Sequence, residues 1–194
     1  MIDIDVRCEG ASLLIQTLTD TPEKAKRAIR MSVNKIARSA RTQMAREVNK
    51  RYFVKVGEAR DTIYIRKAGG DGLKAELVSR GHPSSLAHFR VSPKMVQHKG
   101  RRNKKVHVQV KRNGGGATLD RAFIMAIGKK DGSSVGVFER NGDTKYPVHK
   151  LFGPSVPSML KNEEIQQELE KTTAEKLNKE LNRQLARIAK GGMP

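Results

Sequence analysis

The sequence is poor in cysteine, in aromatic residues and in long apolar runs. It has one cysteine, Cys8, no tryptophan, three tyrosines and five phenylalanines among 194 residues. A single cysteine excludes an internal disulfide and a cysteine-based zinc site, and no run reaches the roughly 18–20 apolar residues that span a membrane. The acidic start, residues 1–10, lacks the apolar core of a signal peptide. We therefore expect a soluble protein that is made in the cytosol and has no membrane contact.

Acidic residues are also few, and the resulting positive charge is concentrated in two segments. The chain holds 39 Lys and Arg against 20 Asp and Glu, a formal net charge of +19. Residues 21–56 contain eleven basic and two acidic residues, and residues 90–112 contain nine basic residues and no acidic one. Such concentrated charge is typical of contact with a polyanion. The alternative is a solvated surface that binds nothing, and the sequence does not choose between them.

The first part of the chain predicts a strand or arm followed by a long basic helix. The length favours one domain over residues 1–194, and the 37 % hydrophobic content predicts a thin core. Ile2, Ile4 and Val6 alternate with charged residues, which predicts a short strand within an N-terminal arm, 1–20. Apolar residues then recur every three or four positions, which predicts a helix over 21–56. Its expected buried stripe is Ala25, Ala28, Ile29, Val33, Ile36, Ala37, Ala40, Met44, Ala45 and Val48.

Residues 57–152 predict an antiparallel β-meander. Short alternating or β-branched runs are separated by Gly-rich turns, such as 113–116 and 141–143, that favour hairpins. The expected strands are 62–65, 73–79, 105–112, 122–127, 135–139 and 146–152. We also expect a mobile basic loop at about 92–105. The predicted fold class is therefore α+β, with long N- and C-terminal helices packed with a central antiparallel β-meander.

The last segment, 153–194, predicts a rigid entry followed by a helix over about 158–190. Pro154 and Pro157 favour extended backbone in the residues before them, and Ser158 is the expected N-cap. A thin apolar line along this helix predicts packing on the first long helix or against another subunit. Gly153, Pro154 and Pro157 are the candidate hinge that sets the angle of the last helix.

No catalytic, cofactor or metal site is expected. The five histidines lack the spacing of a metal pair, and residues 114–116 are not followed by the Lys-Ser/Thr of a phosphate-binding loop. Asp120, Asp131 and Asp143 fall in expected turns, where polar residues are common without any metal. We therefore expect a protein that is not an enzyme. A metal-dependent nuclease is the remaining enzymatic alternative.

The second basic segment is the candidate contact with DNA or with an acidic partner. Lys and Arg neutralise phosphates without reading base sequence, and no aromatic residue stands within 99–105 to stack on bases. The contact would therefore be non-specific. The candidate residues are Lys99, Arg101, Arg102, Lys104, Lys105, Lys111 and Arg112.

Four short segments, taken in order, carry a resemblance to a known family. They are an Ala- and Arg-rich helix at 28–40 with 45–47, Arg-Ala-Phe-Ile at 121–124, Val-Phe-Glu-Arg at 137–140 followed by Tyr-Pro-Val at 146–148, and Leu-Phe-Gly-Pro-Ser-Val-Pro at 151–157. The second has Arg where the family often has Gly. Together, over about residues 25–190, they resemble the minor tail protein Z family of tailed bacteriophages and prophages, a group of tail-completion proteins.

The resemblance implies a structural protein that completes the tail at its head-proximal end. There it would oligomerise and contact tail tube, neck or tape-measure proteins, with its basic surface close to the DNA path. It also implies assembly in the host bacterial cytoplasm and a final place in the virion tail. The alternative function is a free-standing protein that binds nucleic acid non-specifically through phosphate contacts.

Overall fold

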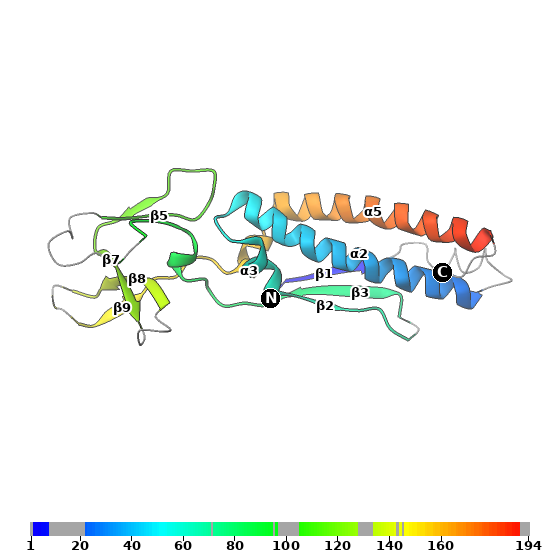
Figure 1. Ribbon diagram of the computed structural model, residues 1–194, viewed down its shortest axis with the longest axis horizontal. Helices are drawn as coiled ribbons and strands as arrows, with labels where there is room; N and C mark the ends of the chain where they lie inside the picture. The colour runs from blue at the N-terminus through cyan, green and yellow to red at the C-terminus, as the bar shows by residue number, and fades with distance from the viewer. Residues whose placement is uncertain are drawn as a thin grey trace.

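The computed structural model describes residues 2–7, 22–70, 72–94, 96, 105–127, 134–142, 144 and 146–190. They form an elongated molecule with two lobes that lie end to end (Figure 1). The helical lobe holds two long helices and a three-stranded sheet, and the β lobe holds two further three-stranded sheets. The predicted α+β class, with long terminal helices and antiparallel strands between them, is confirmed.

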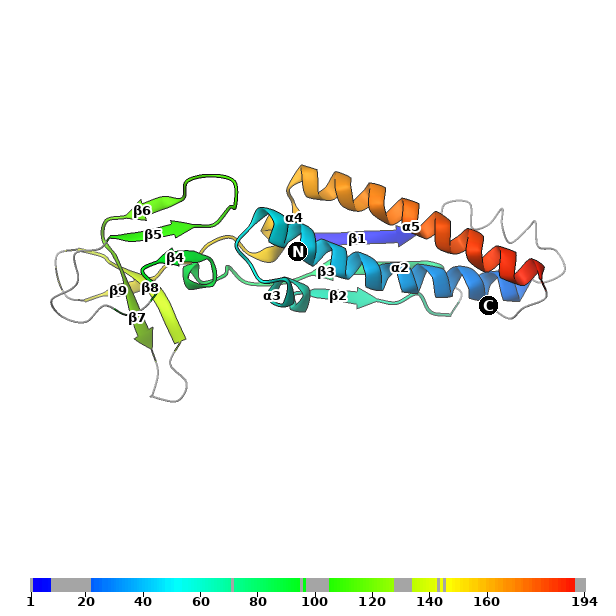
Figure 2. The same ribbon diagram turned by 45° about the horizontal axis from the view of Figure 1, so that its top comes forward.

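The first long helix, α2 (Pro22–Arg51), is the spine of the helical lobe. Every residue of the predicted stripe is buried, from Ala25 near its start to Val48 near its end. The many alanines in the stripe let neighbouring elements approach closely. Figure 2 shows the result, with α5 (Glu163–Ala189) along one side of α2 and a sheet along another.

α2 ends at Arg51, before the predicted end at residue 56, because the chain there turns to pair with the β lobe. The Phe53 N–H donates to the Val110 carbonyl at 2.9 Å, and the Arg112 N–H donates to the Arg51 carbonyl at 2.8 Å. These strand-like bonds replace helical ones. Aromatic and β-branched residues, which fill this part of the chain, favour that exchange.

The sheet of the helical lobe has the order β1-β3-β2. It is formed by β1 (Ile2–Arg7), β2 (Ile63–Arg66) and β3 (Lys74–Ser79), and the short helix α3 (Val56–Asp61) leads into β2. The N-terminal strand pairs with β3 along its whole length. The strands predicted as one meander therefore divide among three sheets, one of which includes the strand predicted in the N-terminal arm.

Two helices, not one, follow the Gly-Pro segment. The first, α4 (Val156–Leu160), has Ser155 as its N-cap, whose hydroxyl accepts from the Ser158 N–H at 3.3 Å. The second, α5, begins after Asn162, whose side chain accepts from two backbone N–H groups of the first turn. The prediction of Ser158 as N-cap is therefore wrong, because the extended Ser155 already starts a helical turn before it.

α5 buries its thin apolar line against α2. The buried residues of α5 include Ile165, Leu169, Leu177, Leu181 and Ile188, which belong to the predicted line. The sequence left open whether this line meets the first helix or another subunit. In the structure it packs within the same chain, and α2 is its principal neighbour.

The β lobe is built from two antiparallel sheets. One contains β4 (Arg90–Ser92), β5 (Val106–Gln109) and β6 (Ala117–Leu119), and the other contains β7 (Ala122–Ile127), β8 (Ser134–Arg140) and β9 (Val148–Lys150). A 3-10 turn, η1 (Leu86–His88), precedes β4. One small cluster of buried side chains joins the two sheets: Val91, Val106, Val108, Ile124 and Val137.

The strands β4 and β6 were not predicted, because three residues are too few to show an alternating pattern. The Gly-rich segment 113–116 connects β5 to β6, while β7 joins the other sheet. Gly116 has φ +74°, and a Cβ there would lie 2.6 Å from the Val108 carbonyl oxygen. Only glycine fits this close turn.

The interface between α2 and α5 buries a carboxylate, Glu180. It accepts hydrogen bonds from Lys35 on α2 at 2.8 Å, and from Arg183 and Gln184 on its own helix at 2.7 and 3.0 Å. Burial alone raises the pKa of Glu180, but these donors outweigh burial and lower the pKa to about 2.

We expect Glu180→Gln to be about 2 kcal/mol less stable at pH 7, because a buried charged acceptor is lost. The folded-state pKa of about 2 lies below the ordinary 4.5. The carboxylate therefore stabilises the fold above pH 4.5, and this stabilisation is lost as the pH falls toward 2. Urea unfolding at several pH values should show a shallower acid decline for Glu180→Gln than for the exposed control Glu175→Gln. Parallel declines would contradict the role of Glu180.

Candidate functional site

Three of the predicted contact residues lie in the described part of the chain: Lys105, Lys111 and Arg112. The other four, Lys99, Arg101, Arg102 and Lys104, lie outside it. Lys105 is exposed, and its Nζ lies 2.7 Å from Asp120 Oδ1. This hydrogen bond raises the pKa of Lys105. Lys105 is thus already paired with a carboxylate of its own chain.

Arg112 ties the β lobe to the end of α2. Its Nε donates to the Asn49 carbonyl at 2.6 Å, and its backbone N–H donates to the Arg51 carbonyl at 2.8 Å. Both acceptors belong to the last turn of α2, whose carbonyls have no partner inside the helix. The predicted contact residue therefore also caps a helix, and its charge suits the negative helix end.

Two arginines contact the ring of Phe53 at the junction of the lobes. The guanidinium carbon of Arg112 lies 4.7 Å from the centroid of the Phe53 ring, and that of Arg90 lies 5.5 Å from it. Each such cation–π contact stabilises by about 0.5–1 kcal/mol at an exposed site. Lys111, next to Arg112, is exposed and bridges to Tyr52 through its backbone. The junction is therefore a positively charged surface.

A hollow of about 570 Å³ lies beside this junction, on the polar face of β4 and β5. It is lined by Arg90, Val91, Ser92, Lys94, His107 and Gln109. In the strand register Arg90 is opposite Gln109 and Ser92 is opposite His107, so these four residues share one face of the sheet. Sequence reasoning missed the face because β4 was not predicted. The signal was present, since Arg90 and Lys94 belong to the basic segment 90–112.

The first basic segment forms the solvent face of α2. Its exposed basic residues are Lys24, Arg27, Lys35, Arg38, Arg46 and Lys50. α2 has 30 residues, which corresponds to a length of about 45 Å. Its two acidic residues are Glu23, which is exposed, and Glu47, which is buried. The exposed face of this helix is therefore strongly positive.

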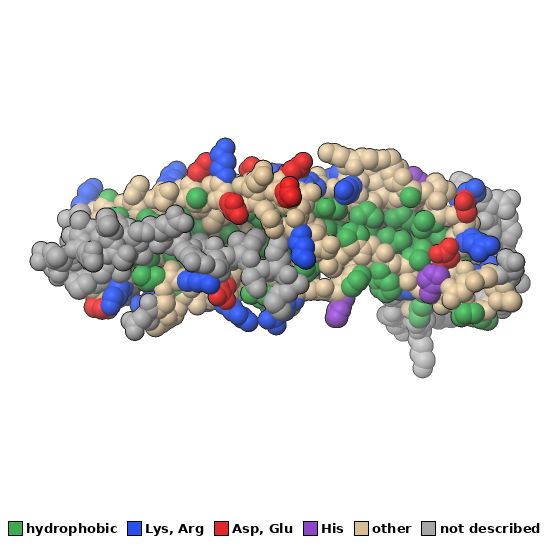
Figure 3. All heavy atoms as spheres, turned by 180° about the vertical axis from the view of Figure 1, so that it is seen from behind, with side chains coloured by type: hydrophobic (Ala, Val, Ile, Leu, Met, Phe, Trp, Pro, Cys, Tyr) green, Lys and Arg blue, Asp and Glu red, His purple; other side chains and the backbone are tan. Residues whose placement is uncertain are grey.

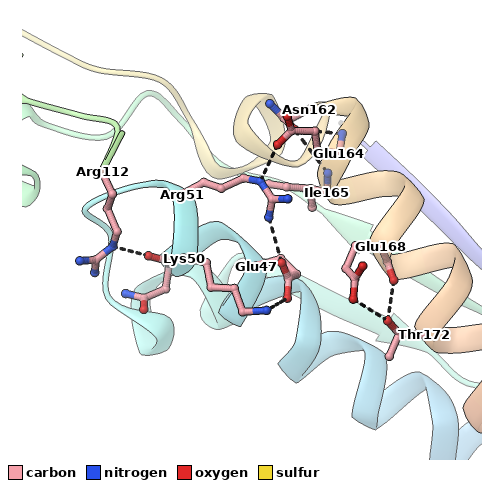
Figure 4. Close-up of polar contacts among 10 residues, drawn as sticks. Glu47, Lys50, Arg51, Arg112, Asn162, Glu164, Ile165, Glu168 and Thr172 are labelled. Atoms are coloured by element: carbon pink, nitrogen blue, oxygen red, sulfur yellow. Dashed lines mark hydrogen bonds and ion pairs between the residues drawn. The ribbon is translucent and has the colours of Figure 1, made fainter. Parts of the chain in front are cut away.

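The buried Glu47 connects the end of α2 to the start of α5. Its carboxylate oxygens lie 2.6 Å from Lys50 Nζ and 2.9 Å from Arg51 Nη1, and Arg51 Nε lies 3.2 Å from Glu164 on α5. Figure 4 shows the guanidinium of Arg51 between the two carboxylates. Burial alone would lower the pKa of Arg51, because it disfavours the charged guanidinium. The hydrogen bonds to Glu164 and Glu47 outweigh burial and raise the pKa of Arg51.

The three predicted hinge residues lie where the β lobe joins α4. The Gly153 N–H donates to the Ser84 carbonyl at 2.8 Å, and a Cβ at Gly153 would lie 2.6 Å from Phe89 Cε2. Pro154 is half-buried, and Pro157 is buried in the first turn of α4. The connection between the lobes is therefore closely packed at these residues.

We expect Gly153→Ala to lower the free energy of unfolding by about 2 kcal/mol, because the added methyl group would overlap the buried ring of Phe89. Gly81→Ala is the matched control. Its Cβ would meet Thr62 Cγ2 at 3.5 Å, an ordinary contact. Urea unfolding of both variants measures the difference. Equal stability of the two would contradict close packing at Gly153.

Hydrophobic side chains are exposed on the β lobe. Figure 3 shows them gathered over the β lobe and the junction on the rear face of the molecule. Ile127 is 51 % exposed and Phe152 is 55 % exposed. On β7 and β8, Phe123 is opposite Phe138, with ring centroids 6.3 Å apart. Strand alternation places Ile127 on the same face as Phe123, away from the small core.

Neither a metal cluster nor a membrane span is found where the structure describes the chain. No three His, Cys, Asp or Glu side chains there are grouped so that they could hold a metal ion. None of the helices there is long and apolar enough to cross a bilayer. The surface features that stand out are instead positive charge and exposed apolar area.

Comparison with known protein families gives one match. The model of prophage minor tail protein Z (GPZ) matches residues 9–190 of the chain. Searches of curated proteins and of solved structures found no match. The matched range contains both long helices and every described strand except β1. The chain therefore belongs to the prophage minor tail protein Z family, a structural family of the phage tail.

Proposed function

We propose that this chain completes the phage tail at its head-proximal end. Copies of it oligomerise there and contact tail tube, neck or tape-measure proteins. The protein acts by docking and not by catalysis, and it uses no cofactor or metal. It assembles in the cytoplasm of the host bacterium and then forms part of the virion tail. Membership of the family supports the tail role.

The observation that carries the proposed oligomer is the thin core of the β lobe. Among the described residues, its two sheets share a small cluster of five buried side chains, while Ile127, Val135 and Phe152 are exposed. Covering apolar surface is favourable by about 25 cal/mol per Å². β7 and β9 are also the edge strands of their sheet, and edges can pair with another chain. We therefore place the main contact between subunits on the β lobe.

The two positive surfaces support a position beside the DNA path or against an acidic partner. One is the solvent face of α2, and the other is the junction around Arg90 and Arg112. The alternative function is a free-standing protein that binds nucleic acid non-specifically through phosphates. The same two surfaces favour it, so a test of assembly is needed to separate the two functions.

Removing the gene for this chain from its phage genome provides that test. We expect heads and tails to form without joining into infectious particles, and purified protein added to the lysate to restore joining. Electron microscopy and plaque counts measure the outcome. Normal virions made without the chain would contradict the proposal. Failure of purified, DNA-binding protein to restore joining would favour the alternative.

We also propose that both lobes fold as one domain, and that Gly153, Pro154 and Pro157 form a hinge that sets the exit angle of the last helix. Pro154→Ala combined with Pro157→Ala is expected to raise the concentration needed for assembly about tenfold while lowering the melting temperature by only a few degrees. Gel filtration and thermal melting measure the two effects, with the exposed Pro83→Ala as control. Equal loss of assembly and of folding would contradict the hinge.

A further inference from the structure

We propose that the polar face of β4 and β5, together with the adjoining junction, binds the phosphate groups of a nucleic acid backbone. This phosphate face is defined by Arg90, Ser92, Lys94, His107 and Arg112. The inference rests on the nucleic-acid contact included in the proposed function and assigns that contact to particular residues.

The register of the strands builds the face. β4 and β5 pair antiparallel, with Arg90 opposite Gln109 and Ser92 opposite His107. The intervening residues Val91 and Val108 point the other way and are buried in the core of the β lobe. Successive side chains on one face of a strand are about 7 Å apart. Burial of the valine face in the core therefore leaves the polar face of the sheet exposed to solvent. The side chains on that face form a row of evenly spaced groups.

The chemistry of the face suits an anion. The residues that line the hollow include two cations, Arg90 and Lys94, and the polar residues Ser92, His107 and Gln109. Among the described residues, those that line the hollow include no carboxylate, and Asp120, which follows β6, is paired with Lys105. Phosphate oxygens accept hydrogen bonds from charged and neutral donors of this kind.

Two of the cations are held in place before any ligand arrives. Arg90 and Arg112 both lie over the ring of Phe53, and Arg112 is further held by the Asn49 carbonyl. Long side chains that are already ordered in the free protein lose less conformational entropy when a ligand binds. Lys94 lines the same hollow as Arg90, and Arg112 extends the positive surface to the end of α2. Cations spread from the hollow to the end of a helix fit an extended polyanion better than a compact acidic group.

The face lacks what base recognition would require. No Phe, Tyr or Trp side chain is among the described residues that line the hollow, so single-stranded bases have no large ring there on which to stack. Phe53 is occupied by two guanidinium groups. We therefore expect binding that depends on phosphates and is independent of base sequence.

Fluorescence anisotropy of the full chain with a labelled duplex of arbitrary sequence tests the inference. The variant Arg90→Gln/Lys94→Gln is compared with Lys171→Gln/Lys179→Gln, which removes the same charge from exposed positions on α5. We expect the first variant to bind about tenfold more weakly at 0.1 M salt, and its slope of log K against log salt to fall by about 2, or about 1 for each lost phosphate contact. We expect the second to stay within about twofold of the wild type.

A charge-conserving variant and a second polyanion serve as controls for this test. Arg90→Lys retains the positive charge, so the slope of log K against log salt should stay unchanged although the contact with Phe53 weakens. Thermal melting checks that each variant folds. A polyglutamate peptide of equal charge serves as a model of an acidic protein partner. Equal weakening by both charge variants, or equal affinity for polyglutamate and duplex, would overturn the inference. Light scattering of the same variants reports oligomerisation separately, so loss of DNA binding with intact assembly would leave the proposed function standing.

Discussion

Arg51→Met is expected to lower the free energy of unfolding by about 3 kcal/mol, because it removes one partner of a buried carboxylate. Glu47 is 1 % exposed, and Arg51 holds it at 2.9 Å while also reaching Glu164 on α5 at 3.2 Å. Methionine keeps most of the length of the side chain, so the loss reports on charge and hydrogen bonding. Lys50 stays within 2.6 Å of Glu47, which keeps the expected loss below that for a fully unpaired charge.

Arg46→Met is the control for this prediction. Arg46 lies on the same helix and is exposed, so its substitution should change stability by less than about 0.5 kcal/mol. Urea unfolding at pH 7 measures both variants. If Arg51→Met were as stable as Arg46→Met, the ion pairs among Glu47, Arg51 and Glu164 would not hold the ends of the two helices together.

Leu160→Ala is expected to cost about 3 kcal/mol of stability, the central value for a fully buried leucine. Leu160 is 0 % exposed at the end of α4, and it belongs to the main core together with residues of α2 and α5. Its loss leaves a cavity at the place where the connection from the β lobe enters the helical lobe. Thermal unfolding followed by circular dichroism measures the effect.

Leu185→Ala provides the comparison, because Leu185 is only half-buried on α5. This substitution should lower the free energy of unfolding by about 1 kcal/mol. Since we propose one folding domain, both variants should unfold in a single transition. Two separate transitions in Leu160→Ala, with the β lobe unaffected, would show that the lobes fold independently. A loss no larger than that of Leu185→Ala would contradict the packing of α4.

The strongest periodic segments were predicted correctly, and the three-residue strands β4 and β6 were not. The stripe of α2 is buried at every predicted position. Ten apolar residues at helical spacing lie on one side of the helix, and this side must face the core. The strand 122–127 matches β7 at both ends. The end of α2 differs from prediction because a distant partner decides it: Arg112 bonds the last carbonyls of α2 from another lobe. The helical segment after Gly153 begins earlier than predicted because Ser155 caps the separate helix α4.

The candidate site was predicted less completely. The sequence indicated that 90–112 is basic, and Arg112 does lie on the positive junction. Composition could not show that Arg90 and Arg112 meet over one ring, because the contact depends on pairing of the chain around Phe53 with β5 and its neighbours. The exposed apolar groups of the β lobe were likewise not identified, since an alternating strand pattern predicts two faces without showing which one lacks a covering layer.

Light scattering of the purified chain at low and at high salt tests the central claim most directly. Contacts through apolar surface on the β lobe predict an oligomer of one defined mass that persists at high salt, because screening weakens charge contacts and leaves apolar ones. Substitution of Ile127 and Phe152, both exposed, by serine should then shift the mass toward that of a 21.6 kDa monomer. A monomer at every salt and protein concentration would contradict self-assembly through this lobe.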